Sequence, residues 1–196
     1  EHIFKFLDVF QTNETLLLVD PVMGDDGELY KMYTQALLER MKELVKRANI
    51  LTPNITECCL LTNSNYEKLY SYRDAKSFIQ ALEAIGQKLQ QETNAQVIIT
   101  GVHIPNNEPS EQTIGNLLID HDETFFSKQP YNGQSYSGTG DLFSAIVMGS
   151  VLRGQSLKAA IQLAESFISS SIHDTALHNT DPKAGVNFEK FLNMLL

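Results

Sequence analysis

The segment from Ser137 to Asp141 reads Ser-Gly-Thr-Gly-Asp and stands directly before an apolar run with helical spacing. Two glycines let the main chain approach a ligand closely, and unpaired N–H groups at the start of a helix attract an anion such as a phosphoryl group. Asp141 falls in the first helical turn. Its carboxylate either stabilises the helix dipole or acts as a general base that takes a proton from an attacking hydroxyl.

A second group of acidic residues follows the apolar run at 16–19, which is typical of a strand buried on both faces. Asp20 ends this run, and Asp25 and Asp26 lie in the turn that comes next. Carboxylate oxygens at such a position suit Mg²⁺ carried with a nucleotide. The alternative interpretation is an acidic turn covered by solvent.

A third motif places Glu57 three residues after Asn54, on the first turn of an expected helix. The same spacing is typical of a capping box, in which the two side chains close that turn and bind no ligand. All three motifs are expected at the carboxyl ends of strands or at helix N-termini. One cleft can therefore hold phosphate-binding N–H groups and carboxylates together.

The elements that position these motifs alternate between strands and helices. This order predicts a three-layer α/β fold with a mainly parallel sheet and an antiparallel hairpin at its edge. The polar stretch at 105–112 is rich in turn formers. The predicted strands are 16–19, 49–52 and 97–100, with the hairpin at 115–119 and 124–126, and the predicted helices are 31–47, 54–61, 74–89, 139–153, 156–173 and a short last one capped by Asn187.

Composition limits the classes of partner. The chain has 196 residues, with 15 Lys and Arg against 24 Asp and Glu, and a formal net charge of −9. This length fits a single domain over residues 1–196. The acidic balance argues against nucleic acid or an anionic membrane as a partner, since both need a positive surface. The adjacent Cys58 and Cys59 are badly placed for a disulfide, which favours a cytoplasmic location.

Four motifs, taken in chain order, resemble those of the pyridoxal kinases of the ribokinase-like superfamily. The resemblance implies ATP-dependent phosphorylation of the 5′-hydroxyl of pyridoxal, pyridoxine or pyridoxamine, which gives pyridoxal 5′-phosphate or its vitamers. The motifs are Asp20-Pro21-Val22-Met23-Gly24-Asp25 with Gly27 and Leu29-Tyr30, Leu51-Thr52-Pro53-Asn54 with Glu57 and Leu60-Leu61-Thr62, Ile99-Thr100-Gly101, and Gly138-Thr139-Gly140-Asp141-Leu142-Phe143.

The resemblance also implies a role for each matching residue. Asp141 is the catalytic base and contacts the substrate, and the N–H groups of Gly138, Thr139 and Gly140 form the anion hole. Mg²⁺ is held by Asp25 and Glu57, with Asp26 as an alternative to Asp25. Asp20, Thr52 and Thr100 lie near the ATP phosphates and a monovalent cation, K⁺ or Na⁺. The other residues expected to bind or border the nucleotide are Asn54, Glu57, Gly101, Tyr30 and the loop at 126–129.

The chain departs from the pyridoxal kinase pattern at its start. These kinases begin with a strand and a lid-bearing segment that supply much of the pyridine-ring pocket, and roughly the first third of that pattern is not found here. The helical spacing of Ile3, Phe6, Leu7 and Phe10 begins at once, so preceding residues are expected. The resemblance further implies a homodimer.

Two other functions stay open. The hydroxymethylpyrimidine phosphate kinases share the Asp-Pro-Val-Met and Thr-Pro-Asn-x-x-Glu motifs. They typically have Cys at the position of Asp141, and Lys-Gly-Gly-His where this chain has Thr100 to His103. Both differences favour a pyridoxal kinase. The second alternative is a binding module for a nucleotide or vitamin, without catalysis, in which Asp141 has no chemical role.

Overall fold

A computed structural model of the chain describes residues 1–104, 113–131 and 133–196. The predicted turn-rich stretch at 105–112 lies outside these residues. The helices are α1 (His2–Phe10), α2 (Gln35–Val45), α3 (Ile55–Thr62), α4 (Tyr66–Tyr70), α5 (Ala75–Thr93), α6 (Thr139–Leu152), α7 (Leu157–Leu177) and the 3-10 helices η2 (Pro182–Ala184) and η3 (Glu189–Leu195). The strands are β1 (Leu18–Val19), β2 (Gly24–Asp25), β3 (Glu28–Leu29), β4 (Ile50–Leu51), β5 (Gln96–His103), β6 (Thr113–Ile119), β7 (Thr124–Phe126) and β8 (Gln129–Pro130).

The central sheet has the strand order β1-β4-β5-β6-β7, and β8 also pairs with β6. β1, β4 and β5 run parallel, whereas β6, β7 and β8 extend the sheet in antiparallel pairings. The carboxyl ends of β1 and β4 therefore lie side by side, next to β5. The predicted α/β class, with parallel strands and an antiparallel hairpin at the edge, is confirmed.

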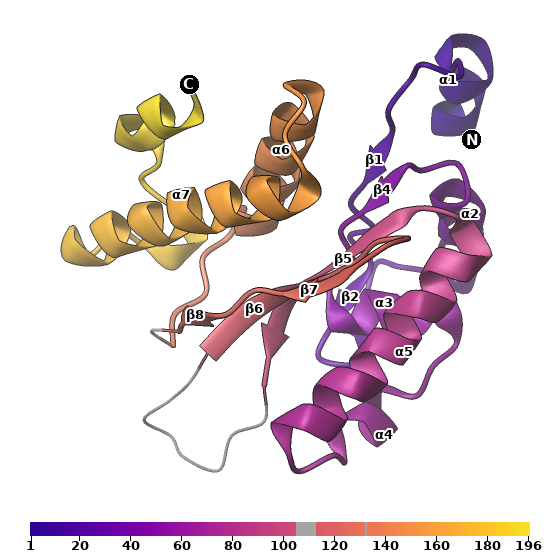
Figure 1. The fold of residues 1–196 in the computed structure, drawn as a ribbon, viewed down its shortest axis with the longest axis horizontal. Coiled ribbons are helices and arrows are strands. Elements are labelled where there is room, and N and C mark those ends of the chain that lie inside the picture. The colour runs from indigo at the N-terminus through magenta and orange to yellow at the C-terminus, as the bar shows by residue number, and fades with distance from the viewer. Residues whose placement is uncertain (105–112, 132) are drawn as a thin grey trace.

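Two hydrophobic cores lie on opposite faces of this sheet. On β5, Val97 and Ile99 face one core and Ile98 faces the other, as the two-residue period of a strand requires. The first core contains buried residues of α2, α3 and α5, and the second contains those of α6 and α7. Figure 1 shows these helices on either side of the strands. The fold thus has the three layers that the alternation of elements predicted.

Most predicted elements occur, with shifted ends. The helix expected from residue 31 begins at Gln35, because the Thr34 hydroxyl accepts a hydrogen bond from Leu37 N–H and caps it there. The prediction that Asn187 caps the last helix is wrong. Phe188 occupies that position, and the Asn187 side chain instead donates to the Thr180 hydroxyl at 3.2 Å.

The predicted turn at 24–27 is the tip of a small hairpin formed by β2 and β3. Asp26 and Gly27 are its two loop residues, with φ angles of 50° and 85°. Two successive positive φ angles are typical of the tight turns that match the twist of a hairpin, and Asp-Gly is a preferred sequence for them. Asp25 and Asp26 are therefore carried by ordered backbone that projects from the end of β1.

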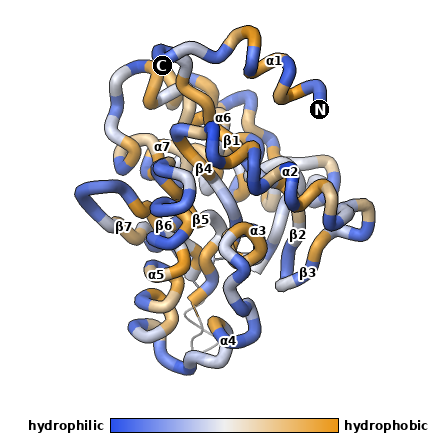
Figure 2. Tube along the Cα trace, turned by 90° about the vertical axis from the view of Figure 1, so that its right-hand side faces the viewer, coloured by the Kyte–Doolittle hydropathy of each residue, from blue (hydrophilic) through white to orange (hydrophobic). Residues whose placement is uncertain are grey.

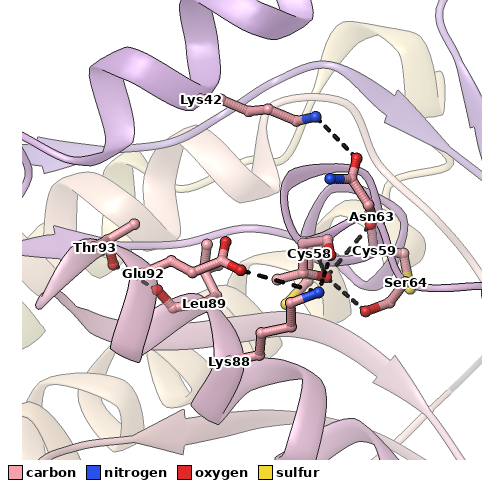
Figure 3. A network of polar contacts seen from close by, with 10 residues as sticks. Lys42, Cys58, Cys59, Asn63, Ser64, Lys88, Leu89, Glu92 and Thr93 are labelled. Carbon is pink, nitrogen blue, oxygen red and sulfur yellow. Dashed lines mark hydrogen bonds and ion pairs between the residues drawn. The ribbon is translucent and has the colours of Figure 1, made fainter.

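The helix that begins at Asn54 is fixed at both ends. At its N-terminus, Asn54 and Glu57 form a capping box. At the C-terminus of α3, Asn63 has a left-handed backbone, and its side-chain oxygen accepts a hydrogen bond from Lys42 Nζ at 2.9 Å (Figure 3). Lys88 Nζ donates to the carbonyl of Thr62 at the same end. The positive charges of these lysines also interact favourably with the negative end of the helix dipole. α3 therefore holds the position of Glu57 rigidly.

The first helix packs through one side only. Leu7 is buried, while Phe6, Val9 and Phe10 are more than half exposed. The hydrophobic stretches of α1 are visible beside the start of the chain in Figure 2. In the described ranges, none of the helices has both the length and the apolar character needed to cross a membrane.

Candidate active site

The parallel strands bring two predicted site residues into direct contact. Asp20 follows β1 and Thr52 follows β4, and the Thr52 hydroxyl lies 2.9 Å from Asp20 Oδ1 and 3.0 Å from Ser144 Oγ. Ser144 is buried on α6, one turn beyond Asp141. Ser144 was not predicted as a site residue from the sequence. The only signal for it is its spacing of three residues from Asp141, which places the two side chains near each other on the same helix.

Asp20 is electrostatically linked to Asp141. Burial raises the pKa of Asp20, the Thr52 hydroxyl opposes the shift, and the charge of Asp141 adds to it. The two carboxylates therefore interact electrostatically, although they are far apart in the sequence. Asp141 therefore lies on the part of α6 that approaches the ends of β1 and β4, and its role as the base stays a prediction.

The N-terminus of α6 presents free donors. Gly138 has a φ of 81° and occupies the cap position, with no side-chain cap. The first helical hydrogen bond runs from Leu142 N–H to the Gly138 carbonyl, and the N–H groups of Gly138, Thr139 and Gly140 have no partner within the described part of the chain. A Cβ at Gly140 would meet no atom within 4 Å. The end of the helix is therefore open to an anion.

The carboxylate of Glu57 joins α3 to the β2–β3 hairpin. Its Oε1 accepts from Met23 N–H at 2.9 Å, and its Oε2 accepts from Asn54 N–H at 2.8 Å. Asn54 Nδ2 donates to the Gly24 carbonyl at 2.8 Å. Asn54 and Glu57 therefore form the capping box that their spacing indicated, and the same pair also fixes the turn that carries Asp25.

Burial has a large effect on Glu57, which is 4% exposed. Burial raises the pKa of its carboxyl to about 7, and the charge of Asp20 adds to the shift, while the N–H groups of Asn54 and Met23 oppose it. Glu57 therefore changes charge near neutral pH. A raised pKa that combines burial with a charged neighbour is common at functional sites.

The strand end at Thr100 and Gly101 differs from the prediction. β5 continues to His103, with an irregularity between Ile99 and Val102, and Gly101 has a φ of 63°. Thr100 forms an isolated parallel bridge with Asn54, and its N–H donates to the Pro53 carbonyl at 2.8 Å. Thr100 is thereby placed beside the start of α3.

The two residues predicted to hold magnesium have different surroundings. Asp25 is exposed, and its Oδ1 accepts from Asp26 N–H at 3.0 Å, whereas both oxygens of Glu57 are bonded to main-chain N–H groups. Burial raises the pKa of Tyr30, and the charges of Asp25, Glu57 and Asp26 add to this shift. No three His, Cys, Asp or Glu side chains in residues 1–104, 113–131 and 133–196 are grouped to hold a metal ion.

The geometry can be compared with that of known proteins. A model of the family described as phosphomethylpyrimidine kinase matches residues 2–186. The chain belongs to this family. The match includes Asp20, Glu57 and Asp141. The residues at the strand ends therefore lie within the part of the chain that the family model covers.

Two relatives of the chain have different named activities. The chain is 30% identical over 187 residues to a pyridoxal kinase from Dictyostelium discoideum, covering 91% of this chain and 57% of the relative. It is also 30% identical over 156 residues to a hydroxymethylpyrimidine/phosphomethylpyrimidine kinase from Haemophilus influenzae, covering 80% of this chain and 54% of the relative. The chain thus spans little more than half the length of these relatives.

A solved structure gives the same fold. It is that of a Bacteroides thetaiotaomicron protein described as a phosphomethylpyrimidine kinase and crystallised with pyridoxal. The TM-score is 0.82 at 29% identity, and the match covers 99% of this chain and 65% of that one. The predicted ribokinase-like fold and the resemblance to the pyridoxal kinase group are confirmed.

Proposed function

We propose that the protein transfers the γ-phosphoryl group of ATP to the hydroxymethyl group of pyridoxal and of the related vitamers pyridoxine and pyridoxamine. The observation that carries this proposal is the open N-terminus of α6, where three N–H groups without a partner among the described residues come just before Asp141. Donors for a phosphoryl group and a base for the attacking hydroxyl thus lie a few residues apart. Membership of a kinase family supports the same reaction class.

The step is an in-line displacement. The substrate hydroxyl oxygen attacks the γ-phosphorus, the bond from that phosphorus to the bridging oxygen breaks, and ADP leaves. Asp141 accepts the hydroxyl proton. The N–H groups of Gly138, Thr139 and Gly140 stabilise the charge that develops on the transferring group.

The acidic residues at the strand ends suit Mg²⁺ that arrives with the nucleotide. Burial and, to a smaller extent, the charge of Asp20 raise the pKa of Glu57, and a nearby cation would oppose this shift. Mg²⁺ in phosphate-transferring sites is typically held by one or two carboxylates together with the phosphates, and not by a complete protein cage. Asp25 or Asp26 and Glu57 would hold it, and Asp20, Thr52 and Thr100 would lie near a monovalent cation. When bound, Mg²⁺ neutralises phosphate charge.

The choice among substrates rests on two positions. Asp141 and the Thr100 to His103 segment differ from the residues typical of the hydroxymethylpyrimidine kinases, which favours the B6 vitamers. The relative from H. influenzae keeps hydroxymethylpyrimidine as the second candidate substrate. A homodimer stays a prediction.

The test is phosphorylation of pyridoxal, pyridoxine, pyridoxamine and hydroxymethylpyrimidine by the longest polypeptide that the gene encodes, with the 196-residue chain assayed beside it. Asp141→Asn is expected to lower kcat by about 10²-fold or more and to leave MgADP binding within about twofold, because the base acts only on the hydroxyl. Asp122→Asn, at an exposed turn, is the matched control.

Two results would contradict the proposal. Turnover by Asp141→Asn at the wild-type rate would remove Asp141 as the base. MgADP binding without phosphorylation of any of these hydroxymethyl compounds by the long polypeptide would favour the binding module.

A further inference from the structure

Helix α7 carries a buried carboxylate that the proposed reaction does not use. Glu165 is 7% exposed. Its Oε1 accepts from Asn116 Nδ2 at 2.6 Å and from the Ser127 hydroxyl, and its Oε2 lies 3.4 Å from Gln129 Nε2. All of the partners supplied by the described residues are neutral. A buried polar side chain is costly unless it is hydrogen-bonded, so these contacts, and not packing alone, account for Glu165 at this position.

The three partners of Glu165 come from separate pieces of the sheet edge. Asn116 lies on β6, Ser127 follows β7, and Gln129 begins β8. Ser127 N–H donates to the Asn116 carbonyl at 3.0 Å, and Asn116 N–H donates to Ser127 Oγ at the same distance. The main chain is close at this point, since a Cβ at Gly115 would lie 2.1 Å from the Ser127 carbonyl oxygen. Glu165 therefore fixes the 126–129 segment against β6.

Asn116 extends this network to the strand that contains Thr100. Its Oδ1 accepts from Gly101 N–H at 3.4 Å, in the irregular part of β5. A carboxylate only accepts hydrogen bonds, so Glu165 requires the NH₂ end of the Asn116 amide. The oxygen end is then turned toward Gly101. In this way Glu165 determines the orientation of a side chain that holds the strand end.

We propose that Glu165 is a positioning residue for the nucleotide. It orders Gly101 and the 126–129 segment together, and these are two regions expected beside ATP, on different strands. The ligand class is a nucleoside di- or triphosphate with Mg²⁺. The inference rests on the proposed function. Among the described residues, the hydrogen bonds of Glu165 go to Asn116, Ser127 and Gln129 and not to the N-terminus of α6, so its role concerns nucleotide affinity and not the proton transfer.

The test measures MgADP binding by calorimetry, and KM for ATP with kcat for pyridoxal, on the longest encoded polypeptide. Glu165→Ala is expected to raise both Kd for MgADP and KM for ATP by about fivefold or more, with kcat within about twofold, since hydrogen bonds that order the site are lost. Glu165→Gln is expected to restore most of the affinity, because its carbonyl oxygen still accepts from Asn116 and Ser127.

The matched control is the other buried carboxylate of α7. Asp174 is 7% exposed and pairs with Lys190 near the C-terminus, away from the sheet edge. Asp174→Asn is expected to change thermal stability but not the Kd for MgADP. Asn116→Ala removes both the link to Gly101 and the hydrogen bond to Glu165 Oε1, and it decides the question if Glu165→Ala does not fold.

Two failures can be told apart. Wild-type protein that binds no MgADP would overturn the proposed function together with this inference. The inference alone would be overturned if the wild-type protein binds MgADP and the variants bind it equally well. The variants are Asn116→Ala and any folded Glu165→Ala, and equal binding means a Kd within twofold of wild type.

Discussion

The raised pKa of Glu57 makes the stability of the protein depend on pH. Its carboxyl is almost fully buried, and burial is the largest cause of a pKa shift from 4.5 to about 7. The folded state therefore binds this proton more tightly than the unfolded chain does. Between these two values, unfolding releases the proton, so the free energy of unfolding falls as pH rises.

The size of the effect follows from the shift. Each pKa unit corresponds to about 1.4 kcal/mol, so the full contribution is about 3 kcal/mol. It is fully present below pH 4.5 and is lost as pH rises through about 7. Between pH 5 and pH 8 the expected loss is about 2.5 kcal/mol, which is a large part of the stability of an ordinary domain.

The assay is urea unfolding followed by circular dichroism at pH 5, 6, 7 and 8, with a chelator present. Glu57→Gln keeps the side-chain shape and does not titrate. The free energy of unfolding of the wild type minus that of Glu57→Gln is expected to fall by about 2.5 kcal/mol over this range. Glu67→Gln, at an exposed position on α4, corrects for the loss of one negative charge. A difference that stays constant, or rises with pH, would refute the reasoning.

Two further predictions concern glycines. Gly140→Ala is expected to keep the wild-type melting temperature, because a Cβ there meets no atom within 4 Å. It is expected to lower kcat/KM about tenfold or more, since the added methyl group occupies space needed for the phosphoryl group. Gly149→Ala, equally open in the same helix, is the control, and equal activity in both variants would contradict this prediction. Gly86→Ala is expected to destabilise the protein by about 1–3 kcal/mol in urea unfolding, because its Cβ would lie 2.7 Å from Cγ1 of Ile119 between α5 and the sheet, and unchanged stability would argue against that packing.

The parts of the fold that the sequence predicted best have local causes. Asp74 caps α5 with a bond from Ser77 N–H, and the apolar stripe that follows packs on the sheet. The capping box of Asn54 and Glu57 likewise depends on residues three positions apart. Such interactions are encoded in a few adjacent residues, so spacing alone reveals them.

The features that were missed depend on contacts between distant residues. β8 has two residues and exists because it pairs with β6. α4 is a single short helix, capped by Asn65, that packs Leu69 into the core. Ser144 joins the site only because α6 packs across the end of β4 and reaches Thr52. None of these features has a periodic pattern of its own, and tertiary packing decides them.

The two interpretations of Glu57 are compatible and lead to one consequence. Its oxygens each accept one N–H group, which leaves a second lone pair on each, and Asp20 acts on the same carboxyl through its charge. Asp141 in turn acts on Asp20. A cation bound among these groups would stabilise the ionised form of each, so it would lower the pKa of Glu57 and reverse the loss of stability above pH 7. Cation binding and the rigidity of the β2–β3 hairpin would thereby be coupled through one side chain.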